Sequence, residues 1–204
     1  MSSTMRELLI ATKNPGKFHE IDQALKGSGY RLLFLGDLDI DDSGFLEDGE
    51  SFKENSYKKA RFYFDKLGML TLGEDSGIEI EALKGELGVK TRRWGAGEKA
   101  SDEEWIEYFL QRMEGEQARG AKFICSACLL DGEREEYFGG ETRGWITEGL
   151  QAPLKRGIPL SSCFLPEGSS TVYAALSEAE KNKLSHRGKA LRGVREYLAL
   201  KREK

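Results

Sequence analysis

Residues 8–25 constrain the fold most, because their pattern changes from that of a strand to that of a helix within a few positions. Residues 8–11 are uniformly apolar, as in a buried strand, whereas Phe18, Ile21 and Leu25 recur at helical spacing until "KGSG" ends the helix. We therefore expect a strand, a short loop and a helix in direct succession.

The loop between this strand and this helix has the composition of an anion site. It reads "ATKNPGK" and contains two lysines, an asparagine and a glycine. A helix that begins directly after such a loop offers unpaired backbone N–H groups, and the lysine ammonium groups add positive charge. The stretch predicts a phosphate-binding loop.

Strands and helices are mixed along the rest of the chain. "RLLFL" predicts a second strand, and "MLTLGEDSGIEIEAL" reads as two short apolar stretches broken by an acidic turn. Residues 122–130 alternate like a strand, and the turn residues Asp131 and Gly132 predict an antiparallel return over 134–138. Three pairs have the spacing of a capping box that opens a helix: Ser51/Glu54, Ser101/Glu104 and Ser177/Glu180. This mixture predicts an α/β fold with a mixed sheet.

Composition narrows the class of protein. With 204 residues and 39% hydrophobic content, the chain suits one domain over residues 1–204. It has no apolar run of membrane-spanning length and no signal-peptide pattern at its start, so we expect a cytoplasmic protein with no membrane partner. The net charge of −4 argues against a nucleic-acid partner, which would require an excess of Lys and Arg on one face.

The most chemically informative segment is "GEDSG", residues 73–77. Glu74 and Asp75 are adjacent carboxylates at the predicted end of an apolar strand, where a cation or a proton is needed to offset their repulsion. Mg²⁺ would serve, because it binds oxygen ligands and often completes its shell with substrate phosphates. Glu47, in the preceding loop, is a candidate third carboxylate. The alternative is a plain acidic turn without a metal.

The cysteines and histidines are less informative. Cys125, Cys128 and Cys163 are odd in number, which argues against a disulfide framework. The single C-x-x-C pair cannot complete a zinc site, and residues three apart on a strand point to opposite faces. We expect His19 on the surface, whereas His186 stands at a helix start beside several lysines.

Four segments taken together resemble a known family. In order and spacing, "ATKNPGK", "EDGESFKENSYKKAR", "GEDSGIEIEALKGELGV" and "EKNKLSHRGKAL" are similar to the motifs of the Ham1-like family of inosine triphosphate pyrophosphatases. The resemblance implies a two-lobed α/β protein with an elongated mixed sheet flanked by helices, an active-site cleft between the lobes, and usually a homodimer. It also implies Mg²⁺-dependent cleavage of a nucleoside triphosphate to the monophosphate and pyrophosphate.

The resemblance also assigns roles to individual residues. Asp75 matches the family's proton acceptor, and Asp75 and Lys17 are the predicted catalytic residues. Glu47 and Asp75 match its metal-binding acids, with Glu74 expected to assist. The predicted nucleotide contacts are Thr12, Asn14, Lys17, Lys59, Ser76, Ile158, Ser161, Lys181, His186 and Arg187. Water would attack the α-phosphorus while the metal and the cationic side chains stabilise the charge on the leaving pyrophosphate.

The chain departs from the family in the loop that would read the base. Where the family has Gly-Phe-Gly-Tyr-Asp-Pro followed by an apolar residue and Phe, this chain has "GIPLSSCF", residues 157–164. Ile158 replaces the stacking aromatic residue, and Ser161 replaces the Asp of the base pocket. We therefore expect weaker discrimination among purines than in the family, unless Trp94 or Tyr173 closes the pocket.

Two functions remain open from the sequence. The first is a pyrophosphohydrolase that acts on ITP, dITP and XTP and so removes non-canonical purine nucleotides from the nucleotide pool. The alternative is a nucleotide-binding or regulatory protein on the same fold, with altered base preference and poor turnover. The joint presence of Lys17, Glu47, Asp75 and Lys181 favours the enzyme.

Overall fold

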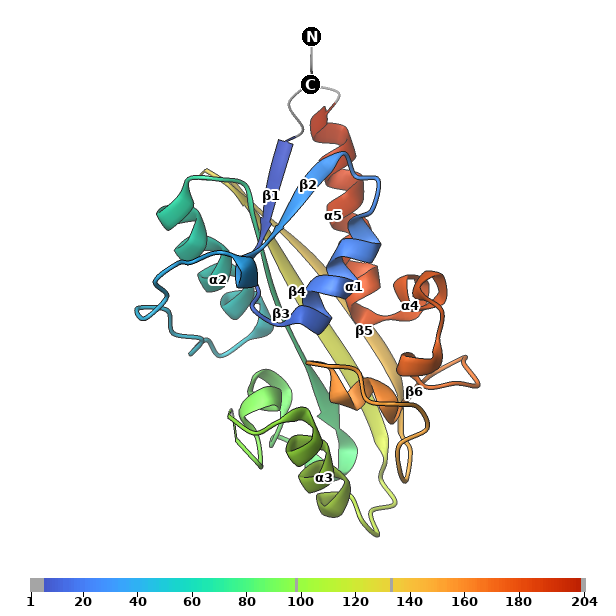
Figure 1. The fold of residues 1–204 in the computed structure, drawn as a ribbon. Helices are drawn as coiled ribbons and strands as arrows, with labels where there is room; N and C mark the ends of the chain where they lie inside the picture. The colour runs from blue at the N-terminus through green and yellow to red at the C-terminus, as the bar shows by residue number, and fades with distance from the viewer. Residues whose placement is uncertain (1–5, 98, 133, 203–204) are drawn as a thin grey trace.

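The computed structural model describes residues 6–97, 99–132 and 134–202 (Figure 1). The strands are β1 (Arg6–Ile10), β2 (Tyr30–Phe34), β3 (Thr71–Ile80), β4 (Gly120–Asp131), β5 (Arg134–Ile146) and β6 (Phe164–Pro166). The α-helices are α1 (Pro15–Leu25), α2 (Phe52–Leu67), α3 (Asp102–Arg112), α4 (Glu178–Leu184) and α5 (His186–Arg202). The 3-10 helices are η1 (Leu35–Asp37), η2 (Glu81–Leu83), η3 (Gly88–Arg93), η4 (Pro159–Ser162) and η5 (Tyr173–Ala175). None of the helices in these residues is both long and apolar enough to cross a membrane.

The six strands form one mixed sheet in the order β2-β1-β3-β4-β5-β6. β1 runs parallel to β2 and β3, whereas β3, β4, β5 and β6 are antiparallel neighbours. The predicted hairpin is confirmed, with Asp131 opposite Arg134 and Gly132 at a left-handed φ of 67°. Its second strand runs to Ile146, well beyond the predicted end at residue 138.

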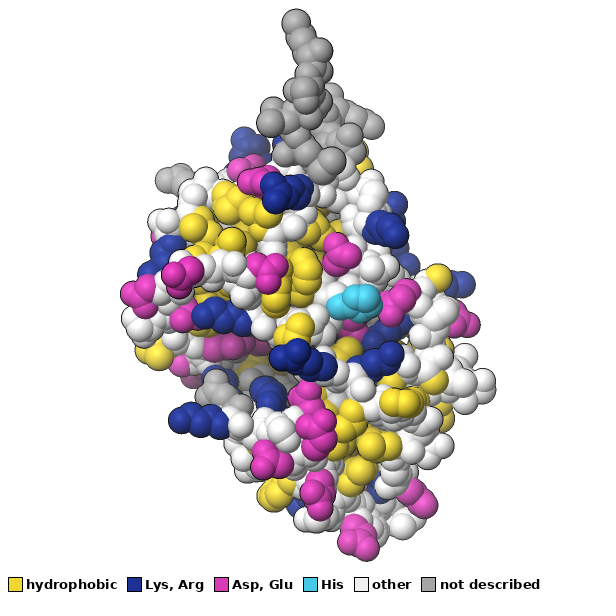
Figure 2. All heavy atoms as spheres, viewed as in Figure 1, with side chains coloured by type: hydrophobic (Ala, Val, Ile, Leu, Met, Phe, Trp, Pro, Cys, Tyr) yellow, Lys and Arg dark blue, Asp and Glu magenta, His cyan; other side chains and the backbone are white. Residues whose placement is uncertain are grey.

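The helices cover the two faces of the sheet unequally. α1 and α5 pack together on one face, α2 lies on the other, and α3 lies at the far end of the long β3 and β4 strands (Figure 1). On the face shown in Figure 2, acidic and basic side chains are intermixed. Leu191, Val194 and Leu198 of α5 are fully buried, as the helical spacing of apolar residues predicts.

The three predicted caps all begin helices. Ser101 and Ser177 form reciprocal capping boxes with Glu104 and Glu180. Ser51 also accepts a hydrogen bond from the backbone N–H of Glu54, although the Glu54 carboxylate accepts one from Glu50 instead.

β3 corrects one prediction, because "MLTLGEDSGIEIEAL" contains no acidic turn between two strands. Thr71–Ile80 is one ten-residue strand, with Glu74 and Asp75 in its middle. The whole of β3 pairs with β4, but β1 pairs only with Thr71 and Leu72. Since β1 ends there, the edge of β3 is uncovered from the next residue onward. Glu74 and Asp75 are nevertheless only 1% and 5% exposed, so each needs a polar or charged partner at its mid-strand position.

Candidate active site

The predicted phosphate loop lies between β1 and α1 and lines a cavity of about 470 Å³. The backbone N–H of Asn14 donates to Thr12 Oγ1 at 3.1 Å, and Asn14 Oδ1 accepts from the backbone N–H of Lys17 at 3.0 Å. Asn14 thereby caps α1, whose first residue is Pro15. The ammonium group of Lys13 pairs instead with Asp42 at 2.6 Å.

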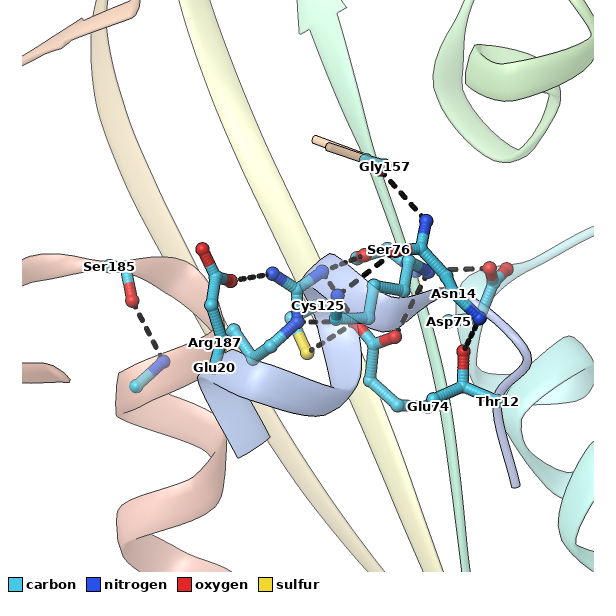
Figure 3. Close-up of polar contacts among 12 residues, drawn as sticks. Thr12, Asn14, Glu20, Glu74, Asp75, Ser76, Cys125, Gly157, Ser185 and Arg187 are labelled. Atoms are coloured by element: carbon cyan, nitrogen blue, oxygen red, sulfur yellow. Dashed lines mark hydrogen bonds and ion pairs between the residues drawn. The ribbon is translucent and has the colours of Figure 1, made fainter. Parts of the chain in front are cut away.

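A hydrogen-bonded clamp connects this loop to the divergent segment 157–164. Asn14 Nδ2 donates to the carbonyl oxygen of Gly157 at 2.8 Å (Figure 3), and the Gly157 N–H donates to Asp102 Oδ2 at 2.6 Å. Gly157 has a left-handed φ of 76°, and a Cβ there would lie 2.2 Å from Asn14 Oδ1. Only glycine fits at this contact. The Gly157 clamp, formed by Asn14, Gly157 and Asp102, thus joins the phosphate loop to the first turn of α3.

Arg187 lies between two buried carboxylates, those of Glu20 and Glu74 (Figure 3). Its Nε donates to Glu74 Oε1 at 3.2 Å, one terminal nitrogen donates to Glu20, and the other donates to Ser76 Oγ at 2.8 Å. Arg187 is only 3% exposed, so its charge needs these partners. Burial alone would lower the pKa of Arg187, but Glu74 and Glu20 outweigh it and raise the pKa above its ordinary value.

Two lysines complete this group, which we call the cation cluster: Lys17, Lys181 and Arg187 with Glu20 and Glu74. Lys17 Nζ lies 3.0 Å from Glu74 Oε2, and Lys181 pairs with Glu20. Burial alone would raise the pKa of Glu74, but Arg187 and Lys17 outweigh it and hold that pKa well below its usual range. Three cations face two carboxylates, so the cluster has one excess positive charge for an anion in the cavity.

Asp75 points to the opposite side of β3 from Glu74, as successive strand residues do. Asn55 Nδ2 of α2 donates to Asp75 Oδ2 at 3.0 Å, and Glu47 is within hydrogen-bonding reach of the Asp75 carboxyl group. Lys59 Nζ lies 2.9 Å from Glu47 Oε1 and donates to the Glu74 carbonyl oxygen at 3.0 Å. Burial, and then the neighbouring charges of Glu47 and Glu74, raise the pKa of Asp75 to about 6.

The geometry separates Glu74 from this acidic pair of Glu47 and Asp75. Among the described residues, no three His, Cys, Asp or Glu side chains converge on one point. Glu74 belongs to the cation cluster instead, contrary to the expectation that it assists in holding a metal. The pair itself fits a hard divalent cation: its donors are adjacent carboxylates that line the cavity, and such an ion can take its remaining ligands from water and phosphate.

The other end of the cavity is lined by apolar and aromatic side chains. His186 stacks on Phe123 with ring centroids 4.6 Å apart, and burial lowers the pKa of His186 to about 3, so its ring is neutral. Tyr173 lines the cavity as expected, but Trp94 does not. The Trp94 ring packs edge-on to Trp105 with centroids 6.1 Å apart, and its N–H donates to Glu86 Oε2 at 3.1 Å.

All ten predicted nucleotide contacts, together with Glu47 and Asp75, line this one cavity; Glu74 does not. Sequence reasoning missed Glu20, Asn55 and Asp102. Glu20 could have been found, because it lies three residues after Lys17 and therefore on the same face of α1. Asp102 could not, because its contact with Gly157 spans 55 residues.

The prediction that His19 lies on the surface is confirmed, and none of the three cysteines forms a disulfide. Cys125, Cys128 and Cys163 are buried and free, and the Cys125 thiol lies 3.4 Å from Glu74 Oε1. His19 is exposed, and its Nε2 lies 3.4 Å from Glu178 Oε1.

Comparison with known proteins places this geometry in a family. The Ham1 family model matches residues 8–197, which is most of the chain. The chain belongs to the Ham1 family. Its relatives in that family include the dITP/XTP pyrophosphatase of Deinococcus deserti, 37% identical over 91% of this chain and 86% of the relative. That of Aquifex aeolicus is 35% identical over 91% of this chain and 93% of the relative.

Solved structures of family members have the same fold. The Staphylococcus aureus Ham1 protein has a TM-score of 0.76 and 29% identity, covering 98% of this chain and all of that one. The Coxiella burnetii HAM1 protein also has a TM-score of 0.76, with 28% identity over 95% of this chain. The elongated mixed sheet flanked by helices is thus the family's architecture, as the resemblance implied.

Proposed function

We propose that this protein hydrolyses dITP, ITP and XTP to the corresponding monophosphate and pyrophosphate. The observation that carries the proposal is that one cavity joins three parts: a cation cluster, an acidic pair and an apolar, aromatic end large enough for a base. The relatives named dITP/XTP pyrophosphatases support the same substrate class.

The cationic side chains would bind the triphosphate. Lys17, Lys181 and Arg187 already have their charges held in place by Glu20 and Glu74, so little reorganisation is needed when phosphate oxygens arrive. The N-terminus of α1 adds backbone N–H groups directed at the same loop. These groups stabilise the negative charge that accumulates on pyrophosphate as the bond to the α-phosphorus breaks.

Asp75 would accept the proton of the attacking water. The water oxygen bonds to the α-phosphorus, its proton passes to the Asp75 carboxylate, and pyrophosphate leaves with the electron pair of the broken P–O bond. Asn55 holds the Asp75 carboxylate from α2, which fixes its orientation. Glu47 and Asp75 would hold Mg²⁺, which supplies charge neutralisation for the phosphates and polarisation of their oxygens.

A substrate panel tests the proposal. Purified protein with Mg²⁺ and each of dITP, XTP, dATP and dGTP should release pyrophosphate rather than orthophosphate, fastest from dITP and XTP. Asp75→Asn should lower kcat by at least about a hundredfold, because it removes a metal ligand and the proton acceptor.

Asp131→Asn, at the tip of the β4–β5 hairpin, is the matched control and should turn over normally. Undiminished activity in Asp75→Asn or in excess chelator would contradict the assignment. Tight nucleotide binding without pyrophosphate release would favour the regulatory alternative.

The assembly and location of the protein belong to the same proposal. By resemblance to the family, we propose a cytoplasmic homodimer that acts on free nucleotides and not on nucleic acid. Sedimentation at micromolar concentration tests the dimer, since a single species of about 46 kDa is expected from two chains of 22.9 kDa each.

A further inference from the structure

Unpartnered polar atoms gather at the aromatic end of the cavity. In the described residues, five buried side-chain atoms lack a hydrogen-bond partner: Glu74 Oε2, Trp105 Nε1, Ser161 Oγ, Tyr173 OH and His186 Nδ1. Glu74 has its ion pair with Lys17, and the Tyr173 hydroxyl is within reach of Thr142 and of the His186 backbone; the other three belong to residues that line this cavity. A buried, unsatisfied donor or acceptor is costly, so three around one cavity indicate groups kept for a ligand.

Trp105 is the most restrictive of the three, because its indole is held in place. It lies in α3, only 2% exposed, and stacks on Phe109 with ring centroids 5.5 Å apart and planes 10° apart. Trp94 packs edge-on against the same ring. These ring contacts hold the indole in one orientation, so its N–H points in a fixed direction.

Ser161 lies in η4, which packs against α3, and it lines the same cavity as Trp105. Its residue is 4% exposed, and it stands in the loop where this chain departs from the family pattern. The two side chains also differ in chemistry. An indole N–H can only donate a hydrogen bond, whereas a hydroxyl can donate or accept.

We propose that Trp105 and Ser161 read the base in this chain, with the Trp105 N–H directed at the substituent on position 6 of the purine. The inference rests on the proposed function and deepens it by assigning base selection to Trp105, which lies outside the family's motif, together with Ser161, which stands where the motif has Asp. A 6-oxo group, as in hypoxanthine or xanthine, accepts the Trp105 N–H. A 6-amino group presents its own donor, which leaves two donors facing each other in a dry pocket. Trp105 is thus a specificity-determining residue that selects against adenine.

The test compares two tryptophan variants. Trp105→Phe keeps an aromatic ring against Phe109 but deletes the N–H together with part of the indole. Trp145→Phe is the matched control, because Trp145 lies on β5, is 50% exposed and does not line the cavity. The ratio of kcat/KM for dITP to that for dATP should fall by about tenfold in Trp105→Phe, the effect of one lost hydrogen bond to a buried partner. Trp145→Phe should leave the ratio unchanged.

Two further measurements distinguish a loss of base recognition from a general loss of binding. Inhibition by inorganic tripolyphosphate, which has no base, should be equal in the wild type and Trp105→Phe, since the cation cluster is untouched. Calorimetric affinities for ITP and ATP, measured in excess chelator so that neither is hydrolysed, test the same discrimination. Ser161→Ala should lower the ITP affinity if Trp105→Phe does not fold. An unchanged ratio in Trp105→Phe, or equal loss of ITP and ATP binding, overturns the inference. Failure of the wild type to release pyrophosphate from any purine triphosphate, with base discrimination still present in the binding ratio, would overturn the proposed function alone.

Discussion

At the scale of single residues, the site depends on buried charges whose partners lie far away in the sequence. Arg187 at the start of α5 is paired with Glu20 of α1 and Glu74 of β3, which are 167 and 113 residues distant. Removing one carboxylate would leave an uncompensated buried cation, which generally costs about 3–5 kcal/mol. The same pairs that hold the fold therefore also set the charge of the cavity.

The neutral ring of His186 leads to a prediction about stability and pH. Burial, and then the charge of Arg187, lower its pKa from 6.5 to about 3. Above pH 6.5 neither the folded nor the unfolded state holds the proton. Below pH 6.5 the unfolded state binds a proton at this histidine, whereas the native state does not. The free energy of unfolding therefore falls as the pH is lowered. Between pH 6.5 and 5 this loss amounts to about 1.5–2 kcal/mol.

The comparison must be made against His186→Gln, which cannot titrate. Asp75 acts in the opposite direction, because its native pKa of about 6 lies above its ordinary 3.8 and its protonation favours the folded state below pH 6. That contribution is common to both proteins and cancels in the difference. Urea denaturation at pH 7, 6 and 5 should show the stability advantage of the wild type shrinking as pH falls. A pH-independent difference would show that the ring is not held neutral.

At the scale of elements, the start of α5 is positioned by a close approach to β5. A Cβ at Gly140 would lie 2.1 Å from the His186 carbonyl oxygen and 2.9 Å from the backbone nitrogen of Ala190. At the neighbouring Gly139 the nearest atom would be 3.9 Å away. The two glycines therefore differ in how much space they leave, not in their chemistry.

Substituting each glycine by alanine tests this positioning. Gly140→Ala should push α5 away from the sheet, lower stability by about 1–3 kcal/mol and reduce kcat/KM, because His186 and Arg187 move with the helix. Gly139→Ala should change stability by less than about 0.5 kcal/mol. Thermal melting and steady-state kinetics on both variants give the result, and equal effects at the two positions would contradict the role of close packing.

The sequence predicts those elements whose signals lie within the segment itself. It fails where contacts with distant segments determine the structure. The capping residues and the loop "ATKNPGK" are local, and both predicted their helices. The mid-strand position of Glu74 and Asp75 depends on where β1 ends relative to β3, which no pattern within the segment records. Trp105 reads as an ordinary core residue of an amphipathic helix, and only the packing of α3 against η4 places it beside the cavity.

At the scale of the whole molecule, the long β3 and β4 strands place separate parts of the chain around one cavity. β3 contributes Asp75 and Ser76, while the Gly157 clamp ties the phosphate loop to the divergent loop. In the function proposed above, the base would occupy the aromatic end of the cavity, and the β- and γ-phosphates would contact the cationic side chains. The α-phosphorus would then be the atom that water attacks.

The most direct measurement is hydrolysis of dITP in water enriched in ¹⁸O, followed by mass spectrometry of both products. Attack at the α-phosphorus places the solvent oxygen in the nucleoside monophosphate and leaves the released pyrophosphate unlabelled. This account predicts one ¹⁸O atom in each dIMP and none in pyrophosphate. Label in pyrophosphate or in orthophosphate would mean that water attacks another phosphorus, and would contradict the central claim.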